Sequence, residues 1–576
     1  MNKQIYALTL LLIASWQLIN TRTITTNDLH EALYEAEPGD TIELKTGYYR
    51  NHSYALKSGK FTKPIRIKSA PNAYVHFFGS PDECIFNAEN LEYVSFEGPM
   101  VLQGALCGFN LANSSFINIT GVSIYDMRQQ AILMSGFSNL ITRNDIQGCV
   151  MENRETARTK TSGWNQCVAI WGLPFGGFSS HITISGNNIS NSYGEAVYLL
   201  NCKYCSVSRN EITNGLSANI YIDSSRNIEI TKNVIRVNST GYNNRNGKAC
   251  GIAMSPDYNN SISRILIENN IIIGTRIGIH FFTEYSGGSY NEVKIYFNTL
   301  WNVDLTPIWF KLSGNITNDT YIDGNEMKNN FIYFAGSREM EPNGAWEFAS
   351  NYFYGTTSYV PYIYRDDYDN TSKAECNLTL DSLFNQISGC ENYYDPNLNP
   401  ECLRPSPEPG KMQLYHSGIS LGYRTFNDIY SCTRSNKNPS VGAYEFPQEC
   451  SEDIEPKNIT QNYDVTFNIT YCTSGYRALK IIGSYCNWNA AKCLTMTKNK
   501  NCIWTTTFYN ATNLNFKYKF AETIQSSIYK IESDPFRIFD GDYLSHIVTY
   551  NRSGYYEDCY FNTTGDMMIT LYCSWR

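Results

Sequence analysis

The chain repeats a pattern of apolar and polar positions with an offset of 23 residues. Two copies are adjacent: Val197-Tyr-Leu-Leu aligns with Ile220-Tyr-Ile-Asp, and residues 207–210 align with residues 230–233. Alternating apolar and polar residues are typical of a strand with one buried face. Because so short a unit cannot bury that face alone, the pattern predicts a solenoid of stacked units.

The first strand of the unit recurs along the chain, and its first and third positions are apolar in every copy. These positions predict two inward columns, Val197, Ile220, Ile252, Ile279 and Ile308, and Leu199, Ile222, Met254, Phe281 and Phe310. A turn with Asn also recurs, and we place it at Asn144, Asn188, Asn210, Asn233, Asn270, Asn298 and Asn330. Asn side chains can bond from rung to rung, and Asn tolerates left-handed backbone. The alternative is an antiparallel sandwich, whose strands do not repeat such a pattern.

The residues between the inward positions are expected to face outward. They form one column of Leu133, Ala169, Tyr198, Tyr221, Ala253, His280 and Trp309, and a second of Ser135, Trp171, Leu200, Asp223, Ser255, Phe282 and Lys311. Rungs lie about 4.8 Å apart, so Tyr198 and Tyr221 are expected to be stacked neighbours. An exposed aromatic row is typical of a binding surface, and flat rings suit the apolar faces of sugars. The alternative is that the loops at 172–180 and 238–248 cover this face.

Charged residues near this face suggest two kinds of catalysis. Hydrolysis takes two carboxylates across a cleft. Elimination takes Ca²⁺ or another cation to neutralise a uronate, and a Lys or Arg of lowered pKa to remove a proton. The candidates are Glu195, Asp223, Asp257 and Glu284 as acids, and His280, Lys203, Lys248 and Lys311 as bases. We take Asp223, Glu195 and His280 as the catalytic candidates, with Asp223 first, and assign no metal ligands.

The N-terminus predicts export. Residues 1–21 place Lys3 ahead of an apolar run that is too short to span a bilayer, as in a signal peptide. The chain has 18 Cys without paired zinc-type motifs, which favours disulfides in an oxidising compartment, and sequons such as Asn118-Ile-Thr fit the same route. The sequence therefore predicts a secreted or lumenal glycoprotein, which we expect to be a monomer.

A net charge of −8 without a basic run argues against nucleic acid or an anionic membrane as a partner. It is also unfavourable for binding a polyuronate. Residues 448–461 are acidic and lose the periodicity, which indicates a linker. Residues 462–576 then show separate alternating strands at the spacing of a β-sandwich.

Two resemblances sharpen this organisation. The segment from Asp28 to Tyr49 reads as a helix, then Pro38-Gly-Asp, a strand and a Gly-x-Tyr motif, followed by Lys63-Pro-Ile-Arg-Ile-Lys. With the closing segment Ser440-Val-Gly-Ala-Tyr-Glu-Phe, it resembles secreted right-handed parallel β-helix proteins of the pectate lyase and chondroitinase B kind. Laid on this chain, the chondroitinase B base falls on Asn201 and its Arg on Ile222. That specific activity is therefore not implied.

Residues 462–576 resemble starch-binding carbohydrate-binding modules of family 20. The resemblance implies a glycan site with Trp488 and Lys519 as the main contacts, supported by Trp504 and Glu532. It departs from the family pattern at Ile531, where a second ring is usual. A disulfide between Cys486 and Cys493 would hold the Trp488 loop.

The sequence thus predicts an all-β protein: a pectin lyase-like right-handed parallel β-helix over residues 22–447, followed by an immunoglobulin-like β-sandwich over residues 462–576. The favoured function is a secreted carbohydrate-active protein that processes a polysaccharide, as a lyase or a glycoside hydrolase, and binds starch or a related α-glucan. Ca²⁺ would be the cofactor of a lyase. The alternative is a non-catalytic glycan-binding protein of a surface or matrix.

Overall fold

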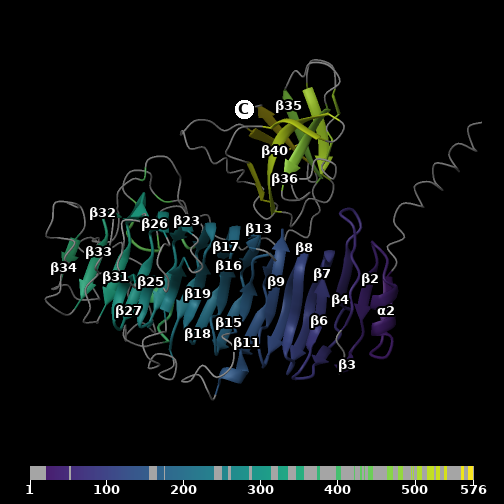
Figure 1. Cartoon of the computed structure of the whole chain (residues 1–576), viewed down its shortest axis with the longest axis horizontal. Coiled ribbons are helices and arrows are strands. Elements are labelled where there is room, and N and C mark those ends of the chain that lie inside the picture. Colours follow the sequence, from purple (N-terminus) through teal and green to yellow (C-terminus); the bar gives the residue numbers. More distant parts are fainter. Residues whose placement is uncertain are drawn as a thin grey trace, which may run out of the picture. The chain divides into compact units, whose positions relative to one another are not determined.

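A computed structural model describes residues 21–50, 54–154, 165–173, 176–238, 250–256, 261–283, 289–312, 322–334, 346–355 and 373–375, short stretches between 397 and 444, and separate strands between 464 and 574 (Figure 1). The chain divides into two compact units, Met1–Glu449 and Cys450–Arg576. The predicted linker and all of the predicted leader except Thr21 lie outside the described residues.

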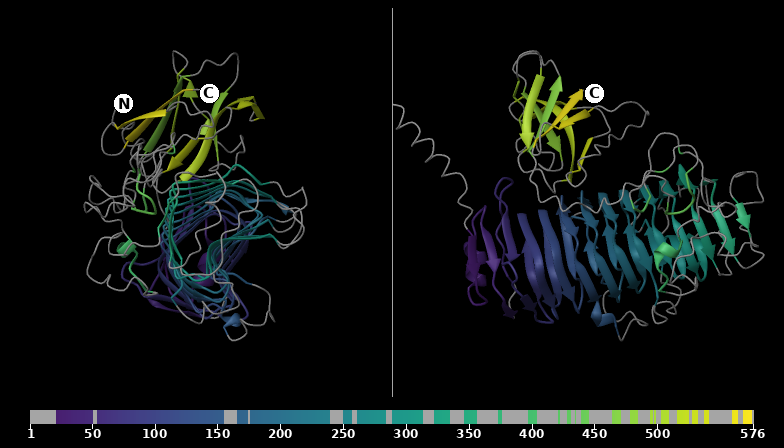
Figure 2. Two further views of the ribbon diagram at one scale, coloured as in Figure 1. Left: turned by 90° about the vertical axis from the view of Figure 1, so that its left-hand side faces the viewer. Right: turned by 180° about the vertical axis from the view of Figure 1, so that it is seen from behind.

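The first unit is a parallel β-helix, in which most coils contribute one strand to each of three sheets. In these coils the strands of the first, second and third sheet follow one another along the chain, and each pairs with its counterpart in the next coil. Seen along the stack, the coils surround one interior (Figure 2).

The first sheet comprises β6 (Cys84–Glu89), the start of β8 (Cys107–Tyr125), β9 (Ile132–Phe137), β12 (Val168–Ile170), β16 (Val197–Leu200), β19 (Ala218–Asp223), β22 (Cys250–Ser255), β25 (Ile277–Thr283) and β28 (Thr306–Leu312). The second sheet comprises β1 (Thr21–Ile24), β2 (Thr41–Leu44), β4 (Ile65–Ser69), the start of β7 (Glu92–Gln103), the middle of β8, β10 (Leu140–Thr142), β14 (Thr183–Ser185), β17 (Cys202–Ser208), β20 (Arg226–Thr231), β23 (Ser261–Glu268), β26 (Ser289–Tyr296), β30 (Asn325–Lys328) and β32 (Trp346–Ala349).

The third sheet comprises β3 (Gly47–Arg50), β5 (Val75–Phe78), the ends of β7 and β8, β11 (Asp145–Cys149), β15 (Asn188–Ser192), β18 (Glu211–Gly215), β21 (Val234–Arg236), β24 (Ile271–Ile273), β27 (Thr299–Val303), β31 (Phe331–Phe334), β33 (Tyr352–Gly355) and β34 (Lys373–Glu375). Two short strands, β13 (Ser179–Ser180) and β29 (Ile322–Asp323), and the 3₁₀ helix η1 (Met151–Asn153) lie between the sheets.

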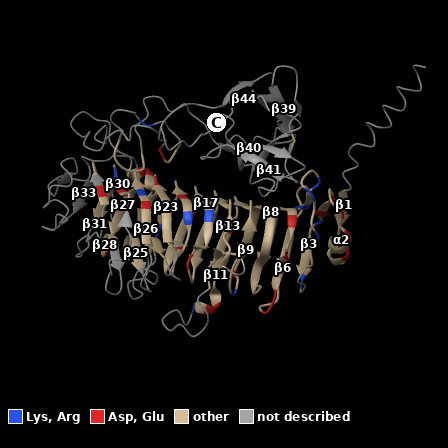
Figure 3. Ribbon diagram, turned by 45° about the horizontal axis from the view of Figure 1, so that its top comes forward, with Lys and Arg blue, Asp and Glu red and all other residues tan. Residues whose placement is uncertain are grey.

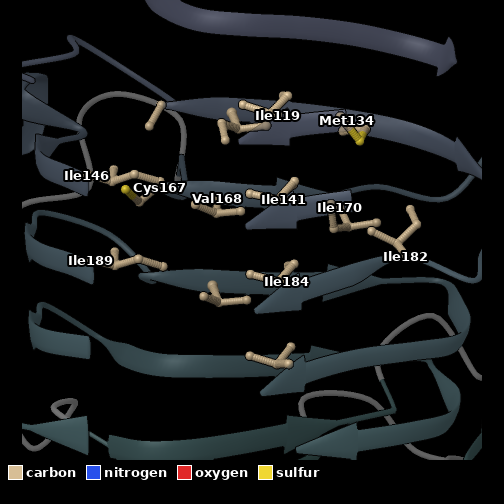
Figure 4. Close-up of a cluster of buried hydrophobic side chains, with 14 of the residues drawn as sticks. Ile119, Met134, Ile141, Ile146, Cys167, Val168, Ile170, Ile182, Ile184 and Ile189 are labelled. Carbon is tan, nitrogen blue, oxygen red and sulfur yellow. The ribbon is translucent and has the colours of Figure 1, made fainter. Parts of the chain in front are cut away.

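The predicted inward columns are confirmed. Val197, Ile220, Ile252, Ile279 and Ile308 are paired in register along β16, β19, β22, β25 and β28, and each is 0 % exposed. The second column is likewise buried from Leu199 to Phe281. The side chain of Phe310 lies outside the described residues, although its backbone is in register with Phe281. Figure 4 shows aliphatic side chains from successive coils that fill the same interior.

A ladder of buried Asn side chains joins the second sheet to the third, as predicted for this turn. Each Asn donates its own amide N–H and a side-chain N–H to the Oδ1 of the next Asn, over about 2.8–3.1 Å. The members are Asn144, Asn187, Asn210, Asn233, Asn270, Asn298, Asn330 and Asn351. These bonds satisfy backbone groups at a turn that water does not reach.

Two details of the sequence interpretation are wrong. The ladder uses Asn187, whereas Asn188 is exposed on β15 and bonds Asp145. The left-handed backbone belongs to the residue before each ladder Asn, such as Gly186, Arg209 and Lys232. The Asn residues are therefore required for their side-chain amides, and the preceding residue takes the strained backbone.

The predicted cap helix is α2 (Leu29–Glu35), which buries Leu29, Ala32 and Leu33 in the same core as the first coils. It covers apolar side chains that a further coil would otherwise cover.

The predicted closing segment packs on the outer side of the third sheet. Val441, Ala443 and Tyr444, with Leu398 and Cys402 near the 3₁₀ helix η6 (Pro400–Leu403), bury outward side chains of β24, β27 and β31, including Trp301. Gly442 has φ +89°, and a Cβ there would lie 2.8 Å from Thr299 Oγ1. Only glycine fits this close approach with that backbone.

Arg434 fixes the closing segment. It is 3 % exposed and donates to the carbonyl oxygens of Ser440, Gly442 and Tyr444 and to Asn269 Oδ1. Its guanidinium lies 4.2 Å from the ring centroid of Phe297.

Three disulfides join described cysteines: Cys84–Cys107, Cys149–Cys167 and Cys202–Cys205. Cys402 is also disulfide-bonded, and Cys250 is a buried free thiol. These bonds agree with the predicted oxidising compartment. Among the residues that the structure describes, no helix is long and apolar enough to cross a bilayer.

The second unit contains two sheets. One has the order β38 (Thr497–Lys498), β39 (Ile503–Phe508), β35 (Asp464–Thr470), β44 (Met568–Ser574) and β43 (Cys559–Thr563). The other has β37 (Leu494–Thr495), β36 (Ala478–Gly483), β40 (Asn515–Ile524) and β41 (Ser527–Ile531), with β42 (Arg537–Asp540) also paired to β40.

Candidate functional site

A row of aromatic rings follows the outer face of the first sheet. Tyr198 and Tyr221 are in register on β16 and β19, and their ring centroids are 5.1 Å apart, as predicted. Two coils further on, His280 stacks against Trp309 at 4.8 Å, and Phe282 lies 4.8 Å from His280 and 5.7 Å from Tyr221. The rings therefore form a continuous series along the stack.

The expectation that the row is openly exposed is wrong for Tyr198, and the other rings are only partly exposed. Tyr198 is 7 % exposed, and Tyr221, His280 and Trp309 are partly buried. Apolar residues at the start of the strands, Ala218, Cys250 and Ile277, pack beside Tyr221 and Trp309. The sequence pattern gives the direction of each side chain but not what its neighbours cover.

Asp223, the first catalytic candidate, is also buried. It is 2 % exposed, and its carboxylate accepts bonds from Tyr198 Oη and Ser224 Oγ, both at 2.8 Å. A carboxylate engaged on both oxygens fixes the end of β19 and the orientation of the Tyr198 ring. In this geometry it acts as a positioning group for the row.

Glu195 and His280 both lie close to the Cys250 thiol. Glu195 is 3 % exposed in the turn before β16, and His280 Nδ1 is 3.7 Å from Cys250 Sγ. Burial, and then the charge of Glu195, raise the pKa of Cys250 to about 12. The thiol is therefore protonated at neutral pH and is not an activated nucleophile.

A cationic pair lies where the first sheet turns into the second. Lys203 and Arg226 occupy paired positions on β17 and β20. The Lys203 Nζ is 5.9 Å and the Arg226 Cζ 4.5 Å from the centroid of the same ring, Phe178. Burial, and then the charge of Arg226, lower the pKa of Lys203. The pair thus offers an amine that is less basic than usual beside a permanent cation.

The loop that carries Phe178 follows β12 and was proposed from the sequence as a cover for this face. Leu173 and Gly177 bridge its base, and a Cβ on Gly172 would lie 2.7 Å from Asn201 Cβ. Trp171, at the start of the loop, remains 40 % exposed. The loop therefore covers the edge beside Lys203 and leaves Trp171 accessible.

Sequence reasoning named Lys203 but missed Arg226 and Phe178. The signal was present for Arg226, because it stands one repeat period after Lys203. Phe178 had no such signal, since it belongs to an insertion outside the repeat. Asp257, Glu284 and Lys248 lie outside the described residues, as does the side chain of Lys311.

The residues expected to bind glycan in the second unit are only partly described. The backbone of Lys519 pairs with Ile482 across β40 and β36, and that of Trp504 with Ile469 across β39 and β35. Their side chains, and the whole of Trp488 and Glu532, lie outside the described residues. Within the described part of the chain, no three His, Cys, Asp or Glu residues are grouped as a metal site.

Residues 107–300 match the family model described as "Right handed beta helix region". The first unit is therefore a right-handed parallel β-helix, as the sequence predicts. No curated protein sequence matches the chain significantly.

Solved structures with a similar fold include pectate lyase Pel9A, with 14 % identity and a TM-score of 0.43 over 75 % of this chain and 98 % of that one. The complex of XylC with xylose has 10 % identity and a TM-score of 0.48 over 74 % of this chain and 99 % of that one. An alginate lyase from Paenibacillus sp. str. FPU-7 has 18 % identity and a TM-score of 0.36 over 57 % of this chain and 97 % of that one. Similarities this low, with at most 18 % identity, do not assign a reaction to this chain.

Proposed function

We propose that the protein is a secreted polysaccharide lyase that binds an acidic chain along the outer face of the first sheet. The observation that carries the proposal is the Lys203 and Arg226 pair at the edge of this face, against Phe178 in the loop that begins at exposed Trp171. Flat rings on successive coils supply stacking surfaces at a spacing of about 4.8 Å, close to the length of a sugar unit.

Elimination needs little from the protein beyond these two cations. Arg226 pairs with the uronate carboxylate and makes the C5 proton more acidic, and Lys203 as the free amine removes that proton. The electron pair forms the C4–C5 double bond, the C4–O bond breaks, and the leaving oxygen takes a proton from water. The lowered pKa of Lys203 raises the fraction of free amine near neutral pH.

Hydrolysis is less well supported by the described residues. It takes two carboxylates facing the bond, one of them protonated. Glu195 and Asp223 are 3 % and 2 % exposed, and the oxygens of Asp223 are engaged by Tyr198 and Ser224. In the elimination reaction, a bound Ca²⁺ would help Arg226 to neutralise the uronate carboxylate. Assays with and without EDTA test whether activity depends on such an ion.

The test follows absorbance near 235 nm and new reducing ends on polygalacturonate, alginate and chondroitin sulfate. Lys203→Met should lower kcat by about 10²–10⁴-fold, the usual range for loss of a general base, with KM nearly unchanged. Arg226→Ala should raise KM as well. Lys294→Ala is the matched control, because this Lys lies on β26, three coils further along the same sheet than Lys203, where it pairs with Glu326 at 3.3 Å. Reducing ends without absorbance would replace elimination by hydrolysis.

The alternative is a non-catalytic glycan-binding protein, and the partial burial of the aromatic row is the observation that favours it. Binding without either product signal would select it. On the lyase proposal, Tyr221→Ala and Trp309→Ala weaken substrate binding while the protein stays folded, because their rings remain partly accessible. Asp223→Asn keeps the bond from Tyr198 and has a smaller effect than Lys203→Met.

For the second unit we propose an immunoglobulin-like sandwich that binds starch or a related α-glucan through Trp488 and Lys519. The support is the ordered set of sequence motifs and the strand order of its two sheets. Pull-down of residues 462–576 on insoluble starch tests it: retention of the wild type and its loss in Trp488→Ala support the site. Equal retention of both, or of neither, assigns the unit another role.

A further inference from the structure

A second aromatic surface lies on the third sheet, at the N-terminal end of the β-helix. Tyr48 on β3 is 55 % exposed, and Tyr74, just before β5, is 52 % exposed. Their ring centroids are 6.1 Å apart, and Tyr48 lies 5.9 Å from His76 and 5.8 Å from Phe78. We call these four residues the Tyr48 platform.

The platform is held by a chain of hydrogen bonds that starts at His76. His76, only 7 % exposed, stacks on Phe78 at 3.8 Å, and its Nδ1 is 3.0 Å from Tyr74 Oη. Its Nε2 is 3.2 Å from Gln103 Oε1, and Gln103 Nε2 donates to Asp126 Oδ2 at 3.0 Å. These hydrogen bonds fix the orientation of the Tyr74 ring. The side chain therefore loses little conformational entropy when a ligand stacks on it.

Polar side chains continue from the platform along the same face. Asp126 is exposed, and in the following coils Asp145 accepts bonds from Tyr125 Oη at 2.6 Å and from Asn188 Nδ2 at 2.9 Å. These outward groups stand on coils about 4.8 Å apart. A sugar chain has a ring and hydroxyl groups in each unit. Aromatic rings on the first coils and carboxylates and amides on the next ones therefore suit such a chain.

The charges along the row of polar side chains from the platform through Asp126 to Asp145, which we call the track, indicate which kind of sugar chain fits this face. Asp126 is exposed and Asp145 partly exposed, so their oxygens keep lone pairs that can accept bonds from hydroxyl groups beside their present partners, and their charge repels uronate carboxylates. The described cation beside the rings is Arg50, whose Cζ lies 5.7 Å from the Phe78 centroid. Figure 3 shows that the strands of this unit carry few charged residues overall. The charges beside the rings are therefore not part of a broad basic surface.

We propose that the Tyr48 platform and the track through Asp126 and Asp145 bind a neutral polysaccharide chain, at a site separate from the Lys203 and Arg226 pair. This role goes beyond the proposed lyase activity, because it anchors the protein on a neutral polymer while the first sheet acts on an acidic one. It requires no reaction at the platform.

Affinity electrophoresis of the full-length protein tests the proposal, with galactomannan, hydroxyethylcellulose or polygalacturonate in the gel. Both neutral probes have β-linked main chains, so an α-glucan site does not contribute. We expect the neutral polymers to retard the wild type. Tyr48→Ala and Tyr74→Ala should each weaken binding about ten-fold, as for truncation of other central aromatic contacts, and the double variant should lose retardation. Tyr34→Ala, which removes a 67 % exposed ring on α2, is the control.

Absence of retardation of the wild type by both neutral polymers would overturn the proposal, as would equal retardation of the double variant and the control. Retardation by polygalacturonate alone would also overturn it, because the acidic polymer would then be held at the Lys203 and Arg226 pair and no neutral chain at the platform. The elimination assay keeps the two sites apart: the Tyr48 and Tyr74 variants should cleave like the wild type, and Lys203→Met should keep its retardation on neutral gels.

Discussion

Two adjacent Asn residues provide a direct test of what holds the coils together. Asn187 lies in the buried ladder and is 1 % exposed, whereas Asn188 is exposed on β15. The two substitutions Asn187→Ala and Asn188→Ala remove the same atoms one residue apart. Their difference therefore reports the ladder and not the loss of an amide in general.

The expected magnitude follows from the bonds. Asn187 Oδ1 accepts from the amide N–H and from the Nδ2 of Asn144, at 3.0 and 2.9 Å, and its Nδ2 donates to Ile141 O and Asn210 Oδ1, both at 2.9 Å. Asn210 Oδ1 keeps the bond from the Asn187 amide. Three buried groups lose a partner: the two N–H groups of Asn144 and the Ile141 carbonyl. Each unsatisfied group costs about 1–2 kcal/mol, the lower half of the usual range, so the free energy of unfolding falls by about 3–6 kcal/mol.

Asn188→Ala should cost much less. It removes one exposed bond to Asp145 Oδ1, at 2.9 Å, and surface changes of this kind stay within about 0.5 kcal/mol. Urea unfolding of the full-length variants, followed by far-ultraviolet circular dichroism, measures both, and the second unit is common to all samples. Equal destabilisation by the two substitutions, or a larger loss from Asn188→Ala, would refute the account of the ladder.

Three further predictions follow from buried groups. Ile220→Asp places an unpaired charge in the core and should abolish secretion of folded protein; wild-type yield on immunoblots of the medium would contradict this. Burial lowers the pKa of His76 below its usual 6.5, so its contribution to stability is present above about pH 6.5 and is lost as the pH falls through the folded-state pKa. The pH dependence of Tm should therefore flatten in His76→Asn, and identical profiles would count against it. Arg434→Lys should speed hydrogen exchange at Gly442 and Ala443, because an ammonium cannot reach the same four acceptors; unchanged protection would show that the segment docks without it.

The sequence alone determined the β-helix and its register. The repeat is local. The alternation within one unit therefore predicts which side chains point inward, and the 23-residue offset between units predicts which residues are paired in register. That is why the columns through Ile220 and Ile222, the turn Asn residues and the cap helix follow from the pattern. The same regularity explains the error at Asn188, because two adjacent Asn residues satisfy the turn pattern equally. Only the structure shows that Asn187 is the one that bonds the carbonyl of Ile141 and the amide of Asn144.

Tertiary structure decided what the outward side chains do. Alternation makes Tyr198 and Asp223 outward residues, but their burial depends on contacts between coils, namely the bond from Tyr198 Oη to Asp223 and the Tyr221 ring against Tyr198. The Tyr48 platform likewise combines residues from coils that share no sequence motif. Contacts between coils are set by the stack and by insertions outside the repeat, such as the loop with Phe178. A periodic pattern therefore fixes the direction of a side chain, whereas its exposure, its partners and its pKa arise only when the coils pack.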